Sequence, residues 1–374
     1  MPRLAGSTGT IRVAKRRVVG ATLRKKDPKW RFALGARPLS EGVVVDLESE
    51  DGIHGYGWVG EIQHLGHDLE SVRTATEELL ALVTELQPDS LQLLFAELEH
   101  AAAGRRPALS GVESAVLDLV AKTTGSPVHT LFGGAFRSEV PVLRILGIKT
   151  PDEMATNAQS LVRDGYRHIK IKIDNDPSGV DADRIRAVRS AVGTGLHLTL
   201  DANQSYDARG AIKLYEAIAD QRIDLFEQPV PARDWNGLRQ VSDALDCIVE
   251  ADEAADSLPN VVRLAGTNAC TGISLKLLKL GGIQAVLHAA RVCHDAGIQC
   301  RLGAHVGSQL LAAAAFQAAV AIENISYACE LAEFARLDGD PFDGLVVDGG
   351  VIRLGSAPGL GVRPLEGALV EQSA

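Results

Sequence analysis

Two lysines, Lys170 and Lys172, alternate with isoleucines in a short stretch that we expect to form a β-strand. Successive side chains of a strand point to opposite faces, so both ammonium groups lie on one face. Two neighbouring cations repel each other, and burying them is costly unless anions lie nearby. The pair therefore indicates either an exposed edge strand, whose lysines oppose aggregation, or a buried face that meets acidic groups.

Three acids end successive predicted strands further along the chain, namely Asp201, Glu227 and Asp252, and Lys276 ends the next one. The four residues recur every 24 to 26 positions, which is about one strand–helix unit. We therefore expect them at similar heights on neighbouring parallel strands. Any one of these acids alone is typical of a loop or a helix cap. Together they predict a metal site, and oxygen donors without thiolates or clustered histidines favour Mg²⁺, with Mn²⁺ as a substitute.

The lysines should flank this metal, because Lys170 and Lys172 precede the acids and Lys276 follows them. An ammonium beside other cations has a lowered pKa and can serve as a base. Such a site suits removal of a proton α to a carboxylate, since the metal can take up the charge of the enediolate. Lys279 is a competing base, but it lies where the sixth strand should have ended.

Further candidates stand next to these positions. Asn203 and Glu253 each follow a predicted metal ligand closely, and we expect Glu253 to support a lysine. Glu330 ends the eighth predicted strand, and we expect it near the substrate. His305 follows the seventh strand and is interpreted either as a substrate contact or as a hydrogen-bonded loop histidine.

The pattern of the chain changes near residue 135. Residues 1–135 predict an α+β domain, residues 136–330 alternate short aliphatic strands with helices, and residues 331–374 consist of strand and turn patterns that should return to the first domain. Eight strands with seven helices between them indicate an α/β fold, a modified TIM barrel of the (β/α)₇β type with an N-terminal cap. The predicted strands are Val140–Leu146, Ile169–Ile173, His197–Asp201, Leu225–Glu227, Ile248–Asp252, Gly272–Lys276, Gln299–Leu302 and Ser326–Glu330. The predicted helices begin near Thr150, Gly179, Tyr206, Asp234, Ser257, Gly282 and Gly307.

The cap also holds candidate substrate contacts. Trp30 lies in a loop between the first strands and either covers hydrophobic residues or forms part of a lid over a ligand. Residues 61–64 (Glu-Ile-Gln-His) are a second candidate for specificity.

Composition narrows the classes of partner. The 374 residues are 46% apolar and carry a net charge of −10, which argues against nucleic acid as the main partner. The sequence has no apolar run long enough to span a membrane and no secretory signal. The five cysteines are an odd number without metal-ligand spacing, so we expect a reduced, cytoplasmic protein.

The motifs resemble those of the enolase superfamily, in the muconate-lactonising enzyme subgroup of the mandelate racemase/muconate lactonising enzyme family. The resemblance covers essentially the whole chain. It rests on Lys170-x-Lys172, Asp201-Ala202-Asn203, Glu227-Gln228-Pro229, Ala251-Asp252-Glu253, Lys276 within residues 274–282, Gly111–Leu119 and Pro358-Gly359-Leu360-Gly361.

The resemblance implies roles for these residues. Asp201, Glu227 and Asp252 would bind Mg²⁺. Lys172 and Lys276 would be the general acid/base pair on opposite faces of the substrate, and a homo-oligomer is implied. By the same resemblance Lys170 would steady the carboxylate or enolate.

The residues expected near the substrate differ from the motifs of known members of the subgroup. Residues 302–309 differ from those of muconate cycloisomerases, and the chain lacks the Asp-x-Asp pair with which dipeptide epimerases grip an ammonium group. His305 lies near the position of the His–Asp dyad of mandelate racemases, but the sixth strand offers Lys276, so we set that subgroup aside.

The sequence thus predicts an isomerase that acts on a small-molecule carboxylate through an enediolate. Racemisation or epimerisation of an amino-acid derivative or dipeptide is favoured, because two bases can deliver a proton to either face. The alternatives are a muconate-type cycloisomerase, a hydroxy-acid dehydratase and, more remotely, a non-catalytic binding protein of the same fold.

Overall fold

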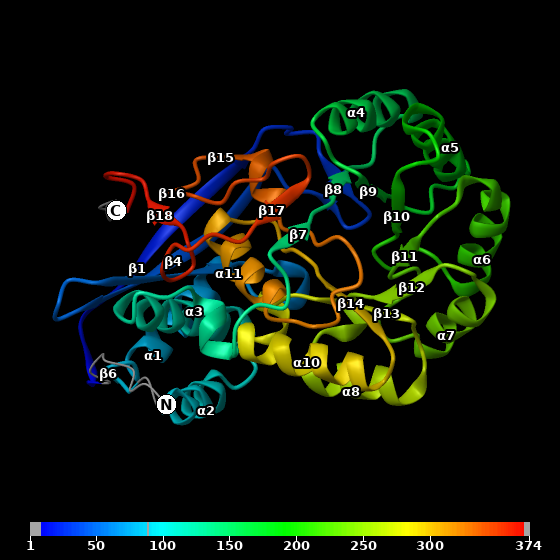
Figure 1. The fold of residues 1–374 in the computed structure, drawn as a ribbon. Helices are drawn as coiled ribbons and strands as arrows, with labels where there is room; N and C mark the ends of the chain where they lie inside the picture. Colours follow the sequence, from blue (N-terminus) through cyan, green and yellow to red (C-terminus); the bar gives the residue numbers. More distant parts are fainter. Residues whose placement is uncertain (1–8, 88–89, 370–374) are drawn as a thin grey trace.

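Seven parallel strands form a curved sheet in the order β14-β13-β12-β11-β10-β9-β8 (Figure 1). The computed structural model describes residues 9–87 and 90–369. Each strand is a short, buried, largely aliphatic run, as parallel strands covered on both faces require. The strands are β8 (Arg144–Leu146), β9 (His168–Lys172), β10 (His197–Asp201), β11 (Leu225–Glu227), β12 (Ile248–Ala251), β13 (Gly272–Leu275) and β14 (Gln299–Leu302).

The predicted eighth strand, Ser326–Glu330, is not a regular strand, so this part of the prediction was wrong. Isolated bridges join Cys329 to Val142 and Ile325 to Cys300, and the Glu330 amide donates to the Leu302 carbonyl at 2.9 Å. The segment therefore closes the barrel between β14 and the first strand without a continuous ladder.

The first predicted strand, Val140–Leu146, is split in two. Residues Glu139–Pro141 form β7, which pairs with β17 (Val351–Arg353) in the C-terminal segment, and only β8 joins the barrel. Pro141 has no amide hydrogen to donate, which fits a break in the ladder at this point.

Helices lie outside the curved sheet and connect successive strands (Figure 1). Their predicted starts agree with the structure to within two residues, and capping side chains mark several of them. Thr150 and Glu153 form a reciprocal capping box at the start of the first of these helices. Asp207 and Asp234 each accept a hydrogen bond from a backbone amide three residues on. The helices are α4 (Pro151–Arg163), α5 (Val180–Val192), α6 (Ala208–Ala217), α7 (Trp235–Ala244), α8 (Leu258–Thr267), α9 (Leu277–Leu280), α10 (Ile283–Asp295) and α11 (Gln309–Val320).

The N-terminal part contains a long antiparallel sheet packed on helices. Strands β1, β4 and β5 are neighbours in the order β15-β1-β4-β5, and a small hairpin, β2 with β3, projects from the loop after β1. The elements are β1 (Ile11–Lys25), β2 (Arg31–Phe32), β3 (Gly35–Ala36), β4 (Leu39–Ser49), β5 (His54–Gly60), β6 (Glu85–Leu86), α1 (Leu69–Leu80), α2 (Leu91–Ala102) and α3 (Arg106–Thr123).

The C-terminal segment returns to this sheet. Strand β15 (Leu337–Asp338) pairs with the end of β1, and β16 (Phe342–Asp343) pairs with β18 (Arg363–Pro364). The buried carboxylate of Asp118 on α3 accepts hydrogen bonds from the amides of Tyr56 in β5 and Leu360 near the C-terminus, at 2.8 and 2.7 Å. Two of the motifs that carry the family resemblance therefore contact each other.

Within residues 9–87 and 90–369, the structure has no helix with both the length and the apolar character needed to cross a bilayer.

Candidate active site

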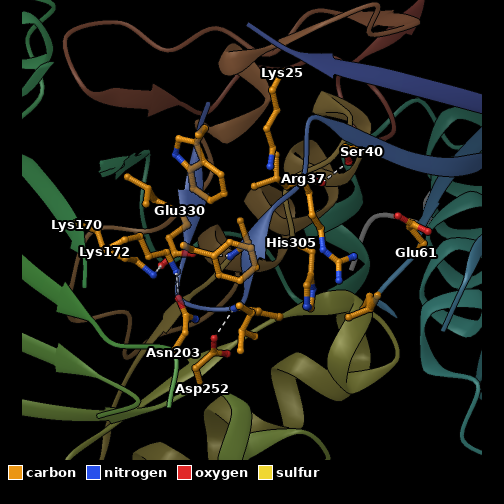
Figure 2. A pocket seen from close by; sticks show the side chains of 18 of the residues that line it. Lys25, Arg37, Ser40, Glu61, Lys170, Lys172, Asn203, Asp252, His305 and Glu330 are labelled. Carbon is orange, nitrogen blue, oxygen red and sulfur yellow. Dashed lines mark hydrogen bonds and ion pairs between the residues drawn. The ribbon is translucent and has the colours of Figure 1, made fainter. Parts of the chain in front are cut away.

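A cavity of about 140 Å³ opens at the C-terminal ends of the barrel strands, beneath the loop that follows β1 (Figure 2). It brings together barrel residues and cap residues that are far apart in the sequence. The barrel residues that line it are Ile145, Lys170, Lys172, Asn203, Asp252, Glu253, Lys276, Ala304, His305, Val306 and Glu330. The cap residues are Lys25, Trp30, Phe32, Leu34, Arg37, Leu39, Ser40, Glu41, Glu61 and Ile62.

Lys170 is buried to 1% exposure, which rules out the exposed-edge interpretation of β9. Its Nζ lies 3.2 Å from Oδ2 of Asp201 and 2.6 Å from Oε2 of Glu227, and it also contacts Glu330. Burial alone would lower the pKa of Lys170, but these three carboxylates raise it well above its usual value. The sequence correctly indicated that this lysine face meets acids.

A second buried cation, Arg301 on β14, was missed by the sequence reasoning. Its guanidinium lies 2.5 Å from Glu227, 2.7 Å from Glu250 and 3.2 Å from Glu330. Arg301 and Glu250 are charged residues within otherwise apolar strands, in positions where the alternation of the strand directs them inward. That signal was available in the sequence, since a buried charge needs a partner.

The three predicted metal ligands are buried, and burial and neighbouring charges shift their pKa values. Burial and the charge of Asp201 raise the pKa of Glu227 well above its usual value. Burial would also raise the pKa of Asp252, yet Lys276 and Lys279 hold it well below the usual range. The charges of Lys172 and Lys170 likewise outweigh burial and lower the pKa of Asp201.

These residues fit a divalent cation by their chemistry. They are oxygen donors, and Oε1 of Glu227 is buried with no hydrogen-bond partner among the described residues. Their oxygens do not converge on one point, and across residues 9–87 and 90–369 no three acidic, histidine or cysteine side chains are gathered as metal ligands. Instead, Asp201 and Asp252 each contact lysines.

Lys172 is held at the cavity wall by polar partners. Its Nζ contacts Asp201 and donates to Oδ1 of Asn203 at 2.8 Å, and it lies 5.5 Å from the ring centre of Phe32. Asn203 in turn donates to Glu253 at 3.0 Å. Glu253 was expected to support a lysine, and its hydrogen bond goes to the side-chain amide that binds Lys172. Burial, followed by the charges of neighbouring acids, raises the pKa of Glu253 to about 7.

Two lysines compete for the role on the sixth strand, and their contacts distinguish them. Nζ of Lys279 donates to three oxygens: the carbonyl and Oδ1 of Asp252 at 2.6 and 2.8 Å, and the carbonyl of Ser274 at 3.0 Å. These contacts use all three of its hydrogens. Nζ of Lys276 contacts Oδ2 of Asp252 at 2.6 Å, and its side chain lines the cavity. Of the two lysines, Lys276 is therefore the one that lines the cavity.

The remaining candidates take different places. Trp30 is 7% exposed and lines the cavity, so it lies over the site as well as covering apolar neighbours. His305 lines the cavity. Glu330 also lines it, but Lys170, Arg301 and the amide of Ala304 already engage its carboxylate.

Of the cap segment 61–64, Glu61 and Ile62 line the cavity. The side chain of His64 lies outside the described residues.

The loop after β1 is tied to the barrel beneath it. Arg31 forms an ion pair with Asp174 at 2.8 Å, and its carbonyl accepts from the amide of Ile148 at 2.9 Å. Lys149 pairs with Asp27 at 2.8 Å. These contacts hold Trp30 over the ends of the strands.

Comparison with known proteins places this geometry in a family. A model described as mandelate racemase / muconate lactonizing enzyme, N-terminal domain, matches residues 17–133, and one described as enolase C-terminal domain-like matches residues 153–368. The chain belongs to the mandelate racemase/muconate lactonising enzyme family of the enolase superfamily, as the sequence motifs predicted.

Individual relatives agree with this assignment. A hydrophobic dipeptide epimerase of Enterococcus faecalis is 31% identical over 92% of this chain and 98% of its own length. An N-succinyl-L-Arg/Lys racemase of Bacillus cereus is 29% identical over 88% of this chain and 89% of its own length. The solved structure of a dipeptide epimerase from Enterococcus faecalis V583, complexed with Mg and the dipeptide L-Leu-L-Tyr, has a TM-score of 0.89 at 29% identity, covering 94% of this chain and 99% of that one. The predicted fold class and the predicted enzyme class, an isomerase of this superfamily, are confirmed.

Proposed function

We propose that this protein removes and returns a proton α to a carboxylate, and so racemises or epimerises an amino-acid derivative or a dipeptide in the presence of Mg²⁺. One observation carries the proposal: Lys172 on β9 and Lys276 after β13 line the same cavity from strands separated by β10, β11 and β12. A cavity with a base on each side can take a proton from one face of a carbon and return it to the other.

The contacts of each residue suggest its role in this reaction. Lys172 and Lys276 move the proton at their Nζ atoms, one on each face of the α-carbon. Asn203 orients Lys172, and Glu253 in turn orients Asn203. Lys170, which lines the cavity, and Arg301 neutralise Glu227 and Glu330.

A divalent cation held by Asp201, Glu227 and Asp252 would supply a Lewis acid that binds the substrate carboxylate and stabilises enediolate charge. Mg²⁺ suits these oxygen donors, and the Enterococcus faecalis epimerase was solved with Mg. Mn²⁺ would serve as a substitute.

The same cavity suits a second reaction, cycloisomerisation of a muconate-type diacid, which the family description includes. That reaction needs the same enolate but only one essential lysine. The product separates the two: a lactone for the cycloisomerase and an inverted centre for the racemase.

We further propose a cytoplasmic location, in keeping with the cysteine pattern, and a homo-oligomeric assembly, which rests on the family resemblance alone.

The test is α-proton exchange in D₂O with Mg²⁺ present, using N-acylated L-amino acids and L,L-dipeptides. Deuterium should enter the α-position with inversion of configuration, and EDTA should abolish both. If no carboxylate in such a panel gains deuterium, the proposal is wrong.

A further inference from the structure

The cap side of the cavity carries two cations for which the described part of the chain offers no carboxylate partner. Lys25 is the last residue of β1 and is 7% exposed, and Arg37 follows the small hairpin. Both side chains line the cavity. Among the described residues, no carboxylate oxygen forms an ion pair with either of them. Nζ of Lys25 instead lies 4.2 Å from the ring centre of Trp30.

The surroundings of Lys25 add positive charge. Burial, and then the charges of Arg336 and Arg37, lower the pKa of Lys25 to about 8. A nearby acid, Glu333, is already engaged, since Arg144 lies 3.3 Å from its Oε1 and Arg336 lies 2.5 Å from its Oε2. A buried ammonium without an anion is costly, so this part of the cavity favours a ligand that brings one.

Two acids in the cap, Glu41 and Glu61, also line the cavity. Both are partly exposed to solvent, and Glu61 accepts a hydrogen bond from Gln63 at 2.9 Å. Figure 2 shows Glu61 at the side of the cavity, well away from Lys25. Water screens exposed charges far better than buried ones, so Lys25 dominates the electrostatics of the cap side.

The cap cations face the proposed reaction centre across the cavity. In Figure 2, Lys25 points down from the cap at the top, whereas Lys172 enters from the barrel at the left and Asp252 from the barrel at the bottom. A substrate whose α-carboxylate lies against the barrel floor would direct its distal end to the cap.

We infer that the preferred substrate carries a second carboxylate, remote from the reacting carbon, which Lys25 and Arg37 receive. This inference rests on the proposed function and narrows its substrate class to dianionic amino-acid derivatives. The distal carboxylate has two possible sources: a dicarboxylic N-acyl group, or an acidic amino-acid side chain.

The test compares dianionic and monoanionic substrates by α-deuterium exchange. N-succinyl-L-phenylalanine and N-acetyl-L-glutamate each carry a second carboxylate, from the acyl group and the side chain respectively, and N-acetyl-L-phenylalanine carries none. We expect kcat/KM of the wild type to be at least about tenfold higher for one of the two dianions, and the preferred one identifies the source. Equal values for all three substrates would overturn the inference.

Variants of Lys25 assign the preference to this residue. Lys25→Met keeps the length of the side chain, and it should lower the ratio of dianion to monoanion kcat/KM about tenfold. Lys25→Arg should restore much of that ratio, and Lys15→Met, an exposed lysine on the same strand, should leave it unchanged. Equal losses for all substrates in Lys25→Met would contradict the inference, provided that its melting temperature matches the wild type.

Binding distinguishes failure of this inference from failure of the proposed reaction. Calorimetry with Mg²⁺ should show tighter binding of N-succinylglycine than of N-acetylglycine to the wild type, by at least about tenfold, and not to Lys25→Met. Exchange without this preference refutes the dianion inference and keeps the proposed function. The preference without exchange on any substrate keeps the dianion subsite and refutes the proposed function.

Discussion

At the scale of single residues, the site is a set of buried charges that neutralise one another. Lys170, which lines the cavity, and Arg301 lie among Glu227, Glu250 and Glu330. Charges at this depth are tolerated only because each contacts opposite charges at hydrogen-bonding distance. The acids are therefore held in place before any ligand arrives.

Arg301→Met tests this arrangement. The substitution leaves Glu227 and Glu250 without their guanidinium partner, and it should lower the free energy of unfolding by about 3–5 kcal/mol, as for other broken buried ion pairs. Urea unfolding measures this loss, and Arg291→Met, at an exposed ion pair on α10, should change the same quantity by less than about 1 kcal/mol. Equal stability of the two variants would contradict the proposed role of Arg301.

At the scale of elements, helix α3 contacts the start of α10 through a buried acid. Oε1 of Glu113 accepts a hydrogen bond from the amide of Gln284 at 3.1 Å. Burial raises the pKa of Glu113 from 4.5 to about 8. The same carboxyl would clash with any side chain at Gly282, where φ is +132°, so glycine is required there.

The raised pKa of Glu113 makes stability depend on pH. Between pH 4.5 and 8 the folded protein binds a proton that the unfolded chain releases, so the contribution of Glu113 to stability is largest below pH 4.5 and is lost as pH rises through 8. Glu113→Gln keeps an acceptor for Gln284 without the charge. The change that this substitution makes in the free energy of unfolding should be more favourable at pH 8 than at pH 5, by roughly 3 kcal/mol. Urea unfolding at both pH values checks this, and an unchanged difference would refute it.

The sequence predicted most elements because their signals are local. Short aliphatic runs mark the barrel strands, and Asp207 and Asp234 mark helix starts within a few residues of the contacts they make. The eighth strand and the first strand were misjudged because their pairing is decided elsewhere. Val142 bridges Cys329, and β7 pairs with β17, and both partners lie near the other end of the chain.

In the candidate site, too, some features follow from local patterns in the sequence and others depend on distant parts of the chain. The acids and lysines at the strand ends follow from their regular spacing, so the sequence could place them near one another. The role of Lys279 as a brace on Asp252 depends on the turn after β13, and the cavity-facing position of Lys25 depends on how the cap folds over the barrel. No local pattern encodes either contact.

At the scale of the whole molecule, the first and last parts of the chain meet at one carboxylate. Asp118 binds the amides of Tyr56 and Leu360, and Lys122 donates to it at 2.6 Å. A side chain at Gly359, where φ is +70°, would collide with Asp118. The Pro-Gly-Leu-Gly motif is thereby fixed against the cap, whose loop covers the cavity.

Asp118→Ala should loosen this junction. It leaves two buried amides without an acceptor and removes the anionic partner of Lys122, which keeps only its hydrogen bond to the carbonyl of His54, so we expect a loss of about 3–5 kcal/mol in the free energy of unfolding. Limited proteolysis should also cleave the segment after residue 337 sooner than in the wild type. Asp343→Ala, at an exposed position in the same segment, serves as the control, and identical cleavage of the two variants would refute the role of Asp118.

In the proposed reaction, Lys172 and Lys276 act on opposite faces of one carbon. This arrangement is tested most directly by α-deuterium exchange of each enantiomer of one N-acyl amino acid by Lys172→Ala and Lys276→Ala, with the exposed Lys213→Ala as control. Each catalytic variant should lose racemisation by about 10²- to 10⁴-fold, as expected for loss of a general acid–base group. Each should still exchange one enantiomer, and the enantiomer should differ between the two variants. Racemisation at the wild-type rate by either variant, or exchange of the same enantiomer by both, would contradict the account.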